Sequence, residues 1–300
     1  MIHAENMNTV EGIFTRYEAV RHRLPTAIFT VKTSEIGSLL DVAEQADAFV
    51  FDAFGVLNVG DTPIAGASER LDQLREKGCK IRILSNAASY DHNSSLRKFR
   101  NLGMKVESDE VVTSRDAALA DLAPTLWGCI AAPSDALSDI KVPTCRLGDN
   151  PQDYDLVDGF LFLSTEVWTP KRQAHLERSL LNNSRPLVIA NADVAAPRES
   201  GFSLEPGHFG HLLADRGIED IRFFGKPFPQ VFEMVEASLA GVEPTRIVMC
   251  GDTLHTDILG AEARGWRTAL VTRDGLFSGS DVRPFCKRAF IHPDWSVPRI

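Results

Sequence analysis

Residues 48–57 read Ala-Phe-Val-Phe-Asp-Ala-Phe-Gly-Val-Leu, so four apolar residues lead directly into an aspartate, Asp52. A short apolar run without alternating polar residues is typical of a strand that is buried on both faces, as in a parallel sheet. Ligands of open parallel sheets bind outside the carboxyl ends of the strands. Asp52 is therefore the first candidate functional residue of the chain.

The segments around this run alternate between strand-like and helical patterns. Three apolar residues place one face on a helix after the first strand, and Gly78 suits the end of that helix. The expected strands are 48–51, 80–84, 222–224, 247–250 and 268–271, and the expected helices include 230–239 and 257–264. This alternation predicts an α/β fold with a Rossmann-like doubly wound parallel sheet, to which all five strands belong. Amphipathic helices are expected before it, at residues 10–20 and 39–43.

Residues 114–214 contain a second set of elements. Strand-like runs occur at 127–131, 159–163 and 187–190, and Thr169-Pro170 is a good start for a helix. We interpret this segment as an inserted α/β domain. The predicted division is a core domain of residues 1–113 and 215–300, with a helical extension at its N-terminus, and an inserted domain of residues 114–214.

Composition limits the classes of partner. The 300 residues carry a net charge of −9 and no Lys/Arg-rich block, which disfavours nucleic acid or a membrane surface as the main partner. Five scattered cysteines without CxxC spacing favour reduced thiols and a cytoplasmic location. The apolar runs are too short for a membrane span. A small anionic molecule is the favoured ligand, and a homo-oligomer stays possible.

Polar residues follow four of the expected strands. Each has an ordinary interpretation alone, as a helix cap or a loop residue, but together they would meet at one sheet edge. They are Asp52, the pair Ser85-Asn86, Lys226, and Asp252 with Asp257. Crowded carboxylates repel one another, and a divalent cation keeps them ionised; oxygen ligands favour Mg²⁺. A hydroxyl, an amide and a lysine beside that cation would form a phosphate cradle.

These motifs resemble the haloacid-dehalogenase (HAD) superfamily. Its four motifs are matched by Phe51 to Leu57, Leu84-Ser85-Asn86, Gly225-Lys226-Pro227 and Gly251 to Asp257. The insertion is similar to the large α/β cap of subclass IIA, the 4-nitrophenylphosphatase-like or predicted sugar phosphatase branch. Residues 63–67 and the turn Asn191-Ala192-Asp193 also resemble that branch.

The resemblance implies a phosphatase for a small phosphate monoester, such as a sugar phosphate or a nucleotide. Asp52 would attack phosphorus to give an aspartyl phosphate that water hydrolyses. Mg²⁺ would be held by Asp52, the backbone carbonyl of Phe54 and Asp252. Asp257, the further metal-site residue, would ligate the ion through water or orient Lys226. Phosphate contacts are expected from Phe54, Gly55, Ser85, Asn86 and Lys226, and cap contacts to the substrate from Asn191 and Asp193. Ser85 and Lys226 are also expected to be catalytic beside Asp52, Lys226 by neutralising charge that builds up in the transition state.

Position 54 departs from the family pattern. HAD phosphatases usually carry there a second aspartate that protonates the leaving group, and Phe54 cannot transfer a proton. A substitute donor such as His255 or a cap residue, or a substrate with a good leaving group, would accommodate the loss. Two alternatives stay open: a noncatalytic protein that binds a phosphorylated ligand, and, less favoured, a dehalogenase. For His208 and His211, surface or packing roles are favoured over metal binding. Arg198 could pair with an anionic group of the substrate, but an exposed salt bridge is the more common role of such a residue.

Overall fold

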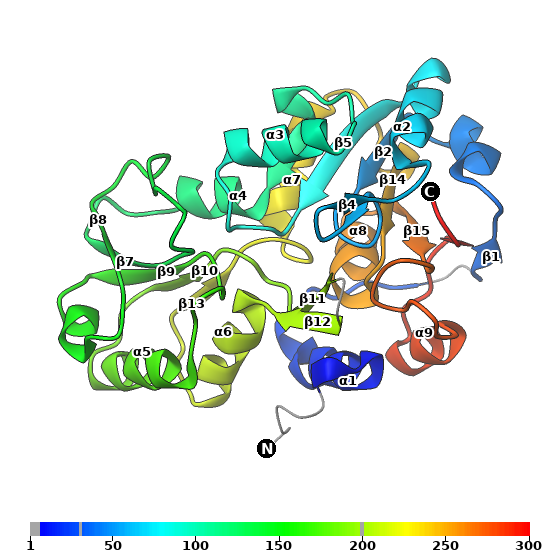
Figure 1. The fold of residues 1–300 in the computed structure, drawn as a ribbon. Coiled ribbons are helices and arrows are strands. Elements are labelled where there is room, and N and C mark those ends of the chain that lie inside the picture. Colours follow the sequence, from blue (N-terminus) through cyan, green and yellow to red (C-terminus); the bar gives the residue numbers. More distant parts are fainter. Residues whose placement is uncertain (1–6, 30–31, 199–200) are drawn as a thin grey trace.

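The computed structural model describes residues 7–29, 32–198 and 201–300, and it contains two parallel sheets side by side (Figure 1). The larger one, the core sheet, has the order β1-β16-β15-β14-β2-β5-β6. Its strands are β1 (Ser34–Glu35), β2 (Ala48–Phe51), β5 (Lys80–Ser85), β6 (Val111–Thr113), β14 (Ile247–Gly251), β15 (Arg267–Val271) and β16 (Trp295–Val297). The strand order changes direction at β2, so the fold class predicted from the sequence is confirmed.

Helices cover both faces of the core sheet because side chains alternate along β2. Phe49 and Phe51 pack with α2 (Ala67–Glu76) and α3 (His92–Asn101), whereas Ala48 and Val50 pack with α4 (Ser114–Ala120) and α7 (Pro229–Ser238). Helices α8 (Leu259–Ala263) and α9 (Arg283–Ala289) complete this part. The expected helix at 39–43 is a 3-10 helix, Leu39–Gln45. In the part of the chain that the structure describes, no helix is both long and apolar enough to cross a membrane.

The five-stranded second sheet, here the cap sheet, has the order β13-β10-β9-β7-β8. Its strands are β7 (Trp127–Ile130), β8 (Thr144–Arg146), β9 (Gly159–Phe162), β10 (Leu187–Ile189) and β13 (Ile221–Phe223), with helices α5 (Pro170–Asn182) and α6 (Pro206–Asp215). Two hairpins, β3 (Asn58–Val59) with β4 (Thr62–Pro63) and β11 (Ala195–Arg198) with β12 (Gly201–Leu204), complete the strands described.

One strand lies in the other sheet from the one expected. The sequence pattern predicts that residues 222–224 belong to the core sheet, but β13 pairs in parallel with β10, with Leu187 opposite Ile221. An apolar pattern indicates a strand without indicating its neighbour, which explains the error. The cap sheet therefore extends past residue 214, and the division of the chain into domains at residues 114 and 214 stays a proposal.

The N-terminal helix α1 (Val10–Val20) contacts residues next to the cap sheet and residues next to the core sheet. Arg16 forms an ion pair of 2.8 Å with Asp215 of α6. The hydroxyl of Tyr17 accepts a hydrogen bond from the backbone N–H of Val194, at 3.1 Å. On the core side, the ring of Tyr17 stacks on His255 with centroids 5.0 Å apart. The expected helix at residues 10–20 is thus confirmed, and it lies across the junction of the two sheets (Figure 1).

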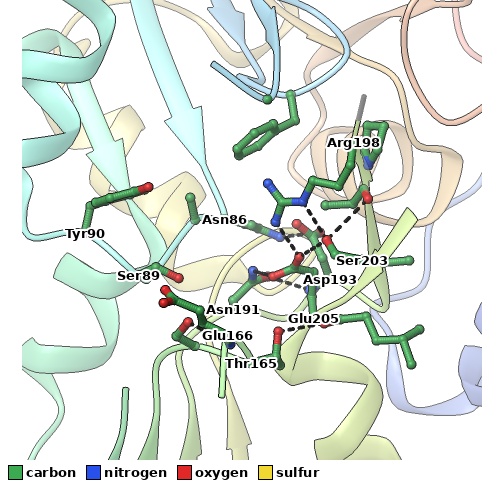
Figure 2. A pocket seen from close by; sticks show the side chains of 18 of the residues that line it. Asn86, Ser89, Tyr90, Thr165, Glu166, Asn191, Asp193, Arg198, Ser203 and Glu205 are labelled. Carbon is green, nitrogen blue, oxygen red and sulfur yellow. Dashed lines mark hydrogen bonds and ion pairs between the residues drawn. The ribbon is translucent and has the colours of Figure 1, made fainter. Parts of the chain in front are cut away.

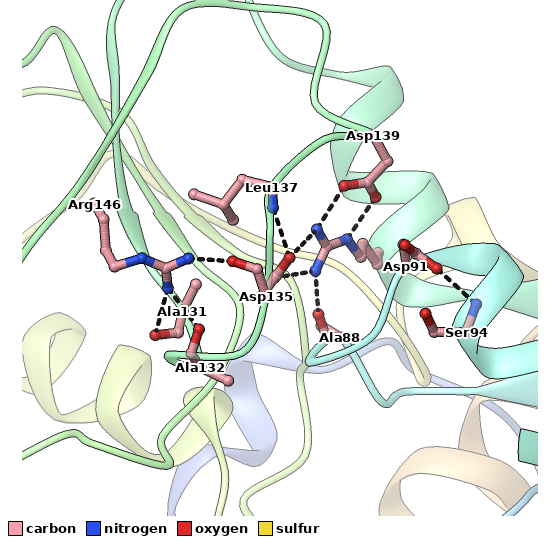
Figure 3. A network of polar contacts seen from close by, with 10 residues as sticks. Ala88, Asp91, Ser94, Ala131, Ala132, Asp135, Leu137, Asp139 and Arg146 are labelled. Atoms are coloured by element: carbon pink, nitrogen blue, oxygen red, sulfur yellow. Dashed lines mark hydrogen bonds and ion pairs between the residues drawn. The ribbon is translucent and has the colours of Figure 1, made fainter.

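A second junction is made by Arg115, which is fully buried in the first turn of α4. Its guanidinium pairs with Asp135 at 2.6 Å and with Asp139 at 2.7 Å, both in the segment after β7 (Figure 3). It also donates to the carbonyl of Ala88, in the loop after β5, at 3.0 Å. One side chain therefore ties the loop after β5 to the segment between β7 and β8.

Replacing Arg115 by methionine should lower the free energy of unfolding by about 3 kcal/mol or more, because Asp135 would stay buried without its partner. Replacing Arg172, whose partner Asp149 is exposed, is the matched control and should cost under about 1 kcal/mol. Urea unfolding of both variants followed by circular dichroism measures the difference. Equal costs would show that the Arg115 network contributes no more than a surface ion pair.

Candidate active site

Three carboxylates gather at the carboxyl ends of two neighbouring core strands. Asp52 follows β2 and Asp252 follows β14, while Asp257 lies one turn further along the chain. One oxygen from each of these three lies within 4.8 Å of the others. Burial raises the pKa of Asp52 to about 6; Lys226 opposes this rise and the charge of Asp257 adds to it. Burial, with repulsion from Asp52 and Asp257, raises the pKa of Asp252 to about 8.

The same three residues fit a hard divalent cation. They offer oxygen atoms alone, and two of the three are almost fully buried. The raised pKa values of Asp52 and Asp252 show that the protein environment by itself disfavours the charged forms of these two carboxyls, and a cation beside them would reverse that effect. The carboxylate set therefore has the composition that Mg²⁺ prefers.

Lys226 lies between two of these carboxylates. Its Nζ atom is 2.5 Å from Oδ1 of Asp52 and 2.8 Å from Oδ1 of Asp257, and it donates to the carbonyl of Leu84 at 2.9 Å. Burial opposes the charged form, but Asp257 and Asp52 outweigh it and raise the pKa of Lys226 above its ordinary value. Lys226 follows β13 of the cap sheet rather than a core strand, yet its ammonium lies beside Asp52 and Asp257, as predicted.

The amide of Asn86 joins three parts of the site. It donates to the carbonyl of Lys226 at 2.9 Å and to Oδ1 of Asp193 at 2.8 Å, and it accepts from the backbone N–H of Lys226 at 2.7 Å. Its amide group is thus engaged with protein partners. Ser85 is buried, and its hydroxyl accepts from the backbone of Ala87 at 3.2 Å. Both residues shape the loop after β5.

A cavity of about 600 Å³ opens above these groups, between the two sheets (Figure 2). Of the expected residues, its wall includes Asp52, Phe54, Asn86, Asn191, Asp193 and Asp252. The wall also includes Ala87 and Ser89, whereas Ser85, Gly55, Lys226 and Asp257 are not among the described residues that line it. The side-chain amide of Asn191 donates a hydrogen bond to the Glu205 carboxylate at 3.2 Å and accepts one from the backbone N–H of Asp193 at 2.8 Å.

Gly55 is required by its surroundings. Its φ is +78°, and a Cβ atom there would lie 2.6 Å from Oδ2 of Asp252. A side chain at this position would collide with that carboxylate and with Cα of Gly275, which would lie 2.5 Å from the Cβ atom. Gly55 therefore contributes by leaving space, which lets the loop after β2 approach the carboxylates closely.

The ring of Phe54 lies under two cations. Nζ of Lys98, from α3, is 4.9 Å from the ring centroid, and Cζ of Arg198, from β11, is 5.0 Å from it. Arg198 forms an ion pair with Glu205 at 2.9 Å, so the expected salt bridge is present, but its side chain lines the cavity instead of lying free on the surface. Lys98 and Glu205 could not be identified from the sequence, because no motif marks residues that converge from distant segments.

His255 does not face the cavity, contrary to the expectation. Its side chain is 1% exposed, and its Nε2 lies 2.5 Å from Oε1 of Glu18 in α1. The reason is the turn at residues 254–258, in which Thr253 and Thr256 line the cavity while His255 points the other way. The hypothesis that His255 supplies the missing proton is therefore wrong.

Of the two roles left open for His208 and His211, surface or packing, the structure shows packing within the interior. Both lie on α6 and are buried, and the ring of His211 stacks on Phe223 at 4.4 Å between centroids. Burial lowers the pKa of His208 to about 4 and that of His211 to about 3. Both imidazoles are therefore neutral near pH 7, which suits a packing role.

Comparison with known proteins agrees with this geometry. The sequence matches the haloacid dehalogenase-like hydrolase family over residues 49–125 and a second family description, HAD-hydrolase-like, over residues 223–297. These two segments contain the loops that carry Asp52, Asn86, Lys226, Asp252 and Asp257.

One relative is glycerol-3-phosphate phosphatase of Rattus norvegicus, 28% identical over 270 residues that cover 80% of this chain and 82% of the relative. Among solved structures, a possible sugar phosphatase of the HAD superfamily from Cytophaga hutchinsonii has a TM-score of 0.77 and 21% identity, covering 90% of this chain and 98% of that one. Glycerol phosphate phosphatase from Mycobacterium tuberculosis in complex with magnesium has a TM-score of 0.62 and 22% identity, covering 81% and 77%. With the family matches and the arrangement of carboxylates and lysine described above, the chain belongs to the haloacid dehalogenase-like hydrolases.

Proposed function

We propose that this protein is a Mg²⁺-dependent phosphatase that hydrolyses a small phosphate monoester through an aspartyl phosphate on Asp52. The observation that carries the proposal is the cluster itself: Asp52 at a strand end, the Lys226 ammonium 2.5 Å away, and two further carboxylates close by. The similarity to glycerol-3-phosphate phosphatase supports the reaction class. The cavity of about 600 Å³ suits a metabolite such as a sugar phosphate or a nucleotide.

In the proposed reaction, each residue of the cluster has a separate role. Asp52 forms the bond to phosphorus, and the departing oxygen keeps the electron pair of the broken P–O bond. Lys226 keeps Asp52 ionised and neutralises charge on the phosphoryl oxygens. Mg²⁺, held by Asp52, Asp252, Asp257 and the carbonyl of Phe54, would supply further positive charge at that point. Asn86 keeps the Lys226 loop and Asp193 in place.

The alternative of a noncatalytic phospholigand-binding protein is favoured by one observation, the phenylalanine at position 54. The ring lines the cavity where a proton donor would act on the leaving group. A dehalogenase is disfavoured, because the three-carboxylate cluster has no use in displacing a halide from carbon. Turnover of an activated ester separates the phosphatase from the binding protein, since such an ester needs little help from an acid.

Purified protein should hydrolyse 4-nitrophenyl phosphate with Mg²⁺ and lose this activity when EDTA is added, with recovery after excess Mg²⁺. The physical reason is that the clustered carboxylates repel both one another and the phosphate unless a cation is present. Release of 4-nitrophenolate, measured by absorbance, follows the reaction. Absence of turnover, together with tight binding of vanadate or phosphate, would favour the binding protein.

The cellular setting is also a proposal. The five cysteines are free thiols, four of them buried, which suits a reducing compartment such as the cytoplasm. A small phosphorylated metabolite is the proposed partner, rather than nucleic acid or a membrane. A homo-oligomer stays a prediction that sedimentation analysis would test.

A further inference from the structure

Arg198 occupies the side of the cavity where the usual acid is missing. Its guanidinium carbon is 5.0 Å from the centroid of the Phe54 ring, and Phe54 is two residues after Asp52. Figure 2 shows the Arg198 side chain extending into the cavity beside Asn86 and Asp193. The aromatic side chain that removes the proton donor therefore also supports a cation at the same place.

The orientation of this guanidinium is fixed from the cap side. Its Nε donates to Ser203 at 2.7 Å, and its Nη2 donates to Glu205 at 2.9 Å. Glu205 is 7% exposed and is itself held by Asn191 and Ser203. Within residues 7–29, 32–198 and 201–300, Nη1 of Arg198 donates to no protein acceptor. A guanidinium held in one orientation with a free N–H group can stabilise negative charge that develops on a nearby oxygen.

We propose that Arg198 stabilises the departing oxygen of the substrate in place of the absent acid, an inference that rests on the phosphatase function proposed above. When Asp52 bonds to phosphorus, the P–O bond of the ester breaks and its electron pair stays on the leaving oxygen. Nη1 of Arg198 donates a hydrogen bond to that oxygen. A guanidinium keeps its own protons, so the oxygen takes its proton from water after it departs.

Lys98 is the competing cation. Its Nζ also lies over the Phe54 ring, but it forms an ion pair of 2.9 Å with Asp61, whose side chain is 90% exposed. Its second aromatic neighbour is Tyr90, at 5.7 Å, whose side chain is exposed to solvent. Both cations line the cavity, and the Lys98 side chain is the less exposed of the two, at 21% against 37% for Arg198. We assign leaving-group stabilisation to Arg198 because Ser203 and the buried Glu205 fix the orientation of its guanidinium, whereas the partner of Lys98 is an exposed carboxylate.

The test compares two aryl esters that differ in the basicity of the leaving group. Arg198→Gln should lower kcat for phenyl phosphate by roughly 10²-fold, the usual effect of removing one donor to a developing oxyanion, and change kcat for 4-nitrophenyl phosphate little. Arg198→Lys, which keeps the charge, should fall between Arg198→Gln and the wild type. Arg172→Gln makes the same chemical change in an ion pair on α5, outside the cavity, and should leave both rates unchanged.

Restoring the acid provides a second readout. In the Arg198→Gln background, Phe54→Asp should recover phenyl phosphate turnover, which a purely structural role of Arg198 does not predict. Equal losses for both esters, or a Lys98→Gln variant that reproduces the selective loss, would overturn the assignment. Failure of the wild-type protein to hydrolyse 4-nitrophenyl phosphate would instead reject the phosphatase function. Retained turnover of 4-nitrophenyl phosphate by Arg198→Gln also shows that the variant folds.

Discussion

Replacing Asp52 by asparagine is expected to lower the turnover of 4-nitrophenyl phosphate by roughly 10⁶-fold, the scale on which loss of a nucleophile acts in other covalent enzymes. Asparagine has nearly the same shape, so the loop after β2 should keep its conformation. Its amide is a poor nucleophile, however, and its neutral side chain gives Lys226 no charge to pair with. Both effects act on the chemical step, so kcat should fall.

Two measurements complete this test. Acid quenching of the wild-type protein during turnover, followed by intact mass spectrometry, should show the added mass of one phosphoryl group, and Asp52→Asn should show none. Asp149→Asn, an exposed aspartate paired with Arg172, is the matched control and should retain full activity. Substantial turnover by Asp52→Asn would exclude the aspartyl phosphate.

Introducing an acid at position 54 is expected to produce the second large effect, a gain. Phe54→Asp should raise kcat for phenyl phosphate by roughly 10²- to 10⁴-fold, the range over which general acids act, and change kcat for 4-nitrophenyl phosphate little. The new carboxyl would lie two residues after the nucleophile, beside Arg198 and Lys98, which now flank the aromatic ring. The gain comes from protonating a basic leaving oxygen.

The pair of substrates decides how this result is interpreted. Equal gains on both esters would mean that Phe54 limits access to the cavity instead of lacking an acid. No gain on either ester would mean that Arg198 and Lys98 hold the new carboxyl in its ionised form, so that it cannot act as an acid, or that a later step limits turnover. Measuring the formation of phenol and the release of phosphate in single-turnover experiments separates these two cases.

The core fold could be predicted because its signals are local. The apolar run before Asp52, the periodicity of α2 and the strand before Asp252 are all contained in short segments, and each element formed as expected. Three polar loops after adjacent strands must meet at one sheet edge, so Asp52, Asn86 and Asp252 could be grouped without a structure.

The features that could not be predicted depend on contacts between distant segments. Nothing in residues 221–223 indicates that they pair with β10 instead of a core strand. Nothing around His255 indicates that a helix from the N-terminus covers it. Arg198 is 144 residues away from Phe54 in the sequence, and only the packing of the β11–β12 hairpin against the loop after β2 brings them together.

The contacts of α1 bear on how such a protein can change during evolution. A cap is often pictured as an interchangeable module, yet here Asp215 and the amide of Val194 take their partners from Arg16 and Tyr17 of the N-terminal helix. Grafting the cap sheet and its helices onto another core would leave that carboxylate and that amide without these partners. We therefore expect a transplanted cap to be stable only when the N-terminal helix is transferred with it, although a long stretch of sequence separates the two.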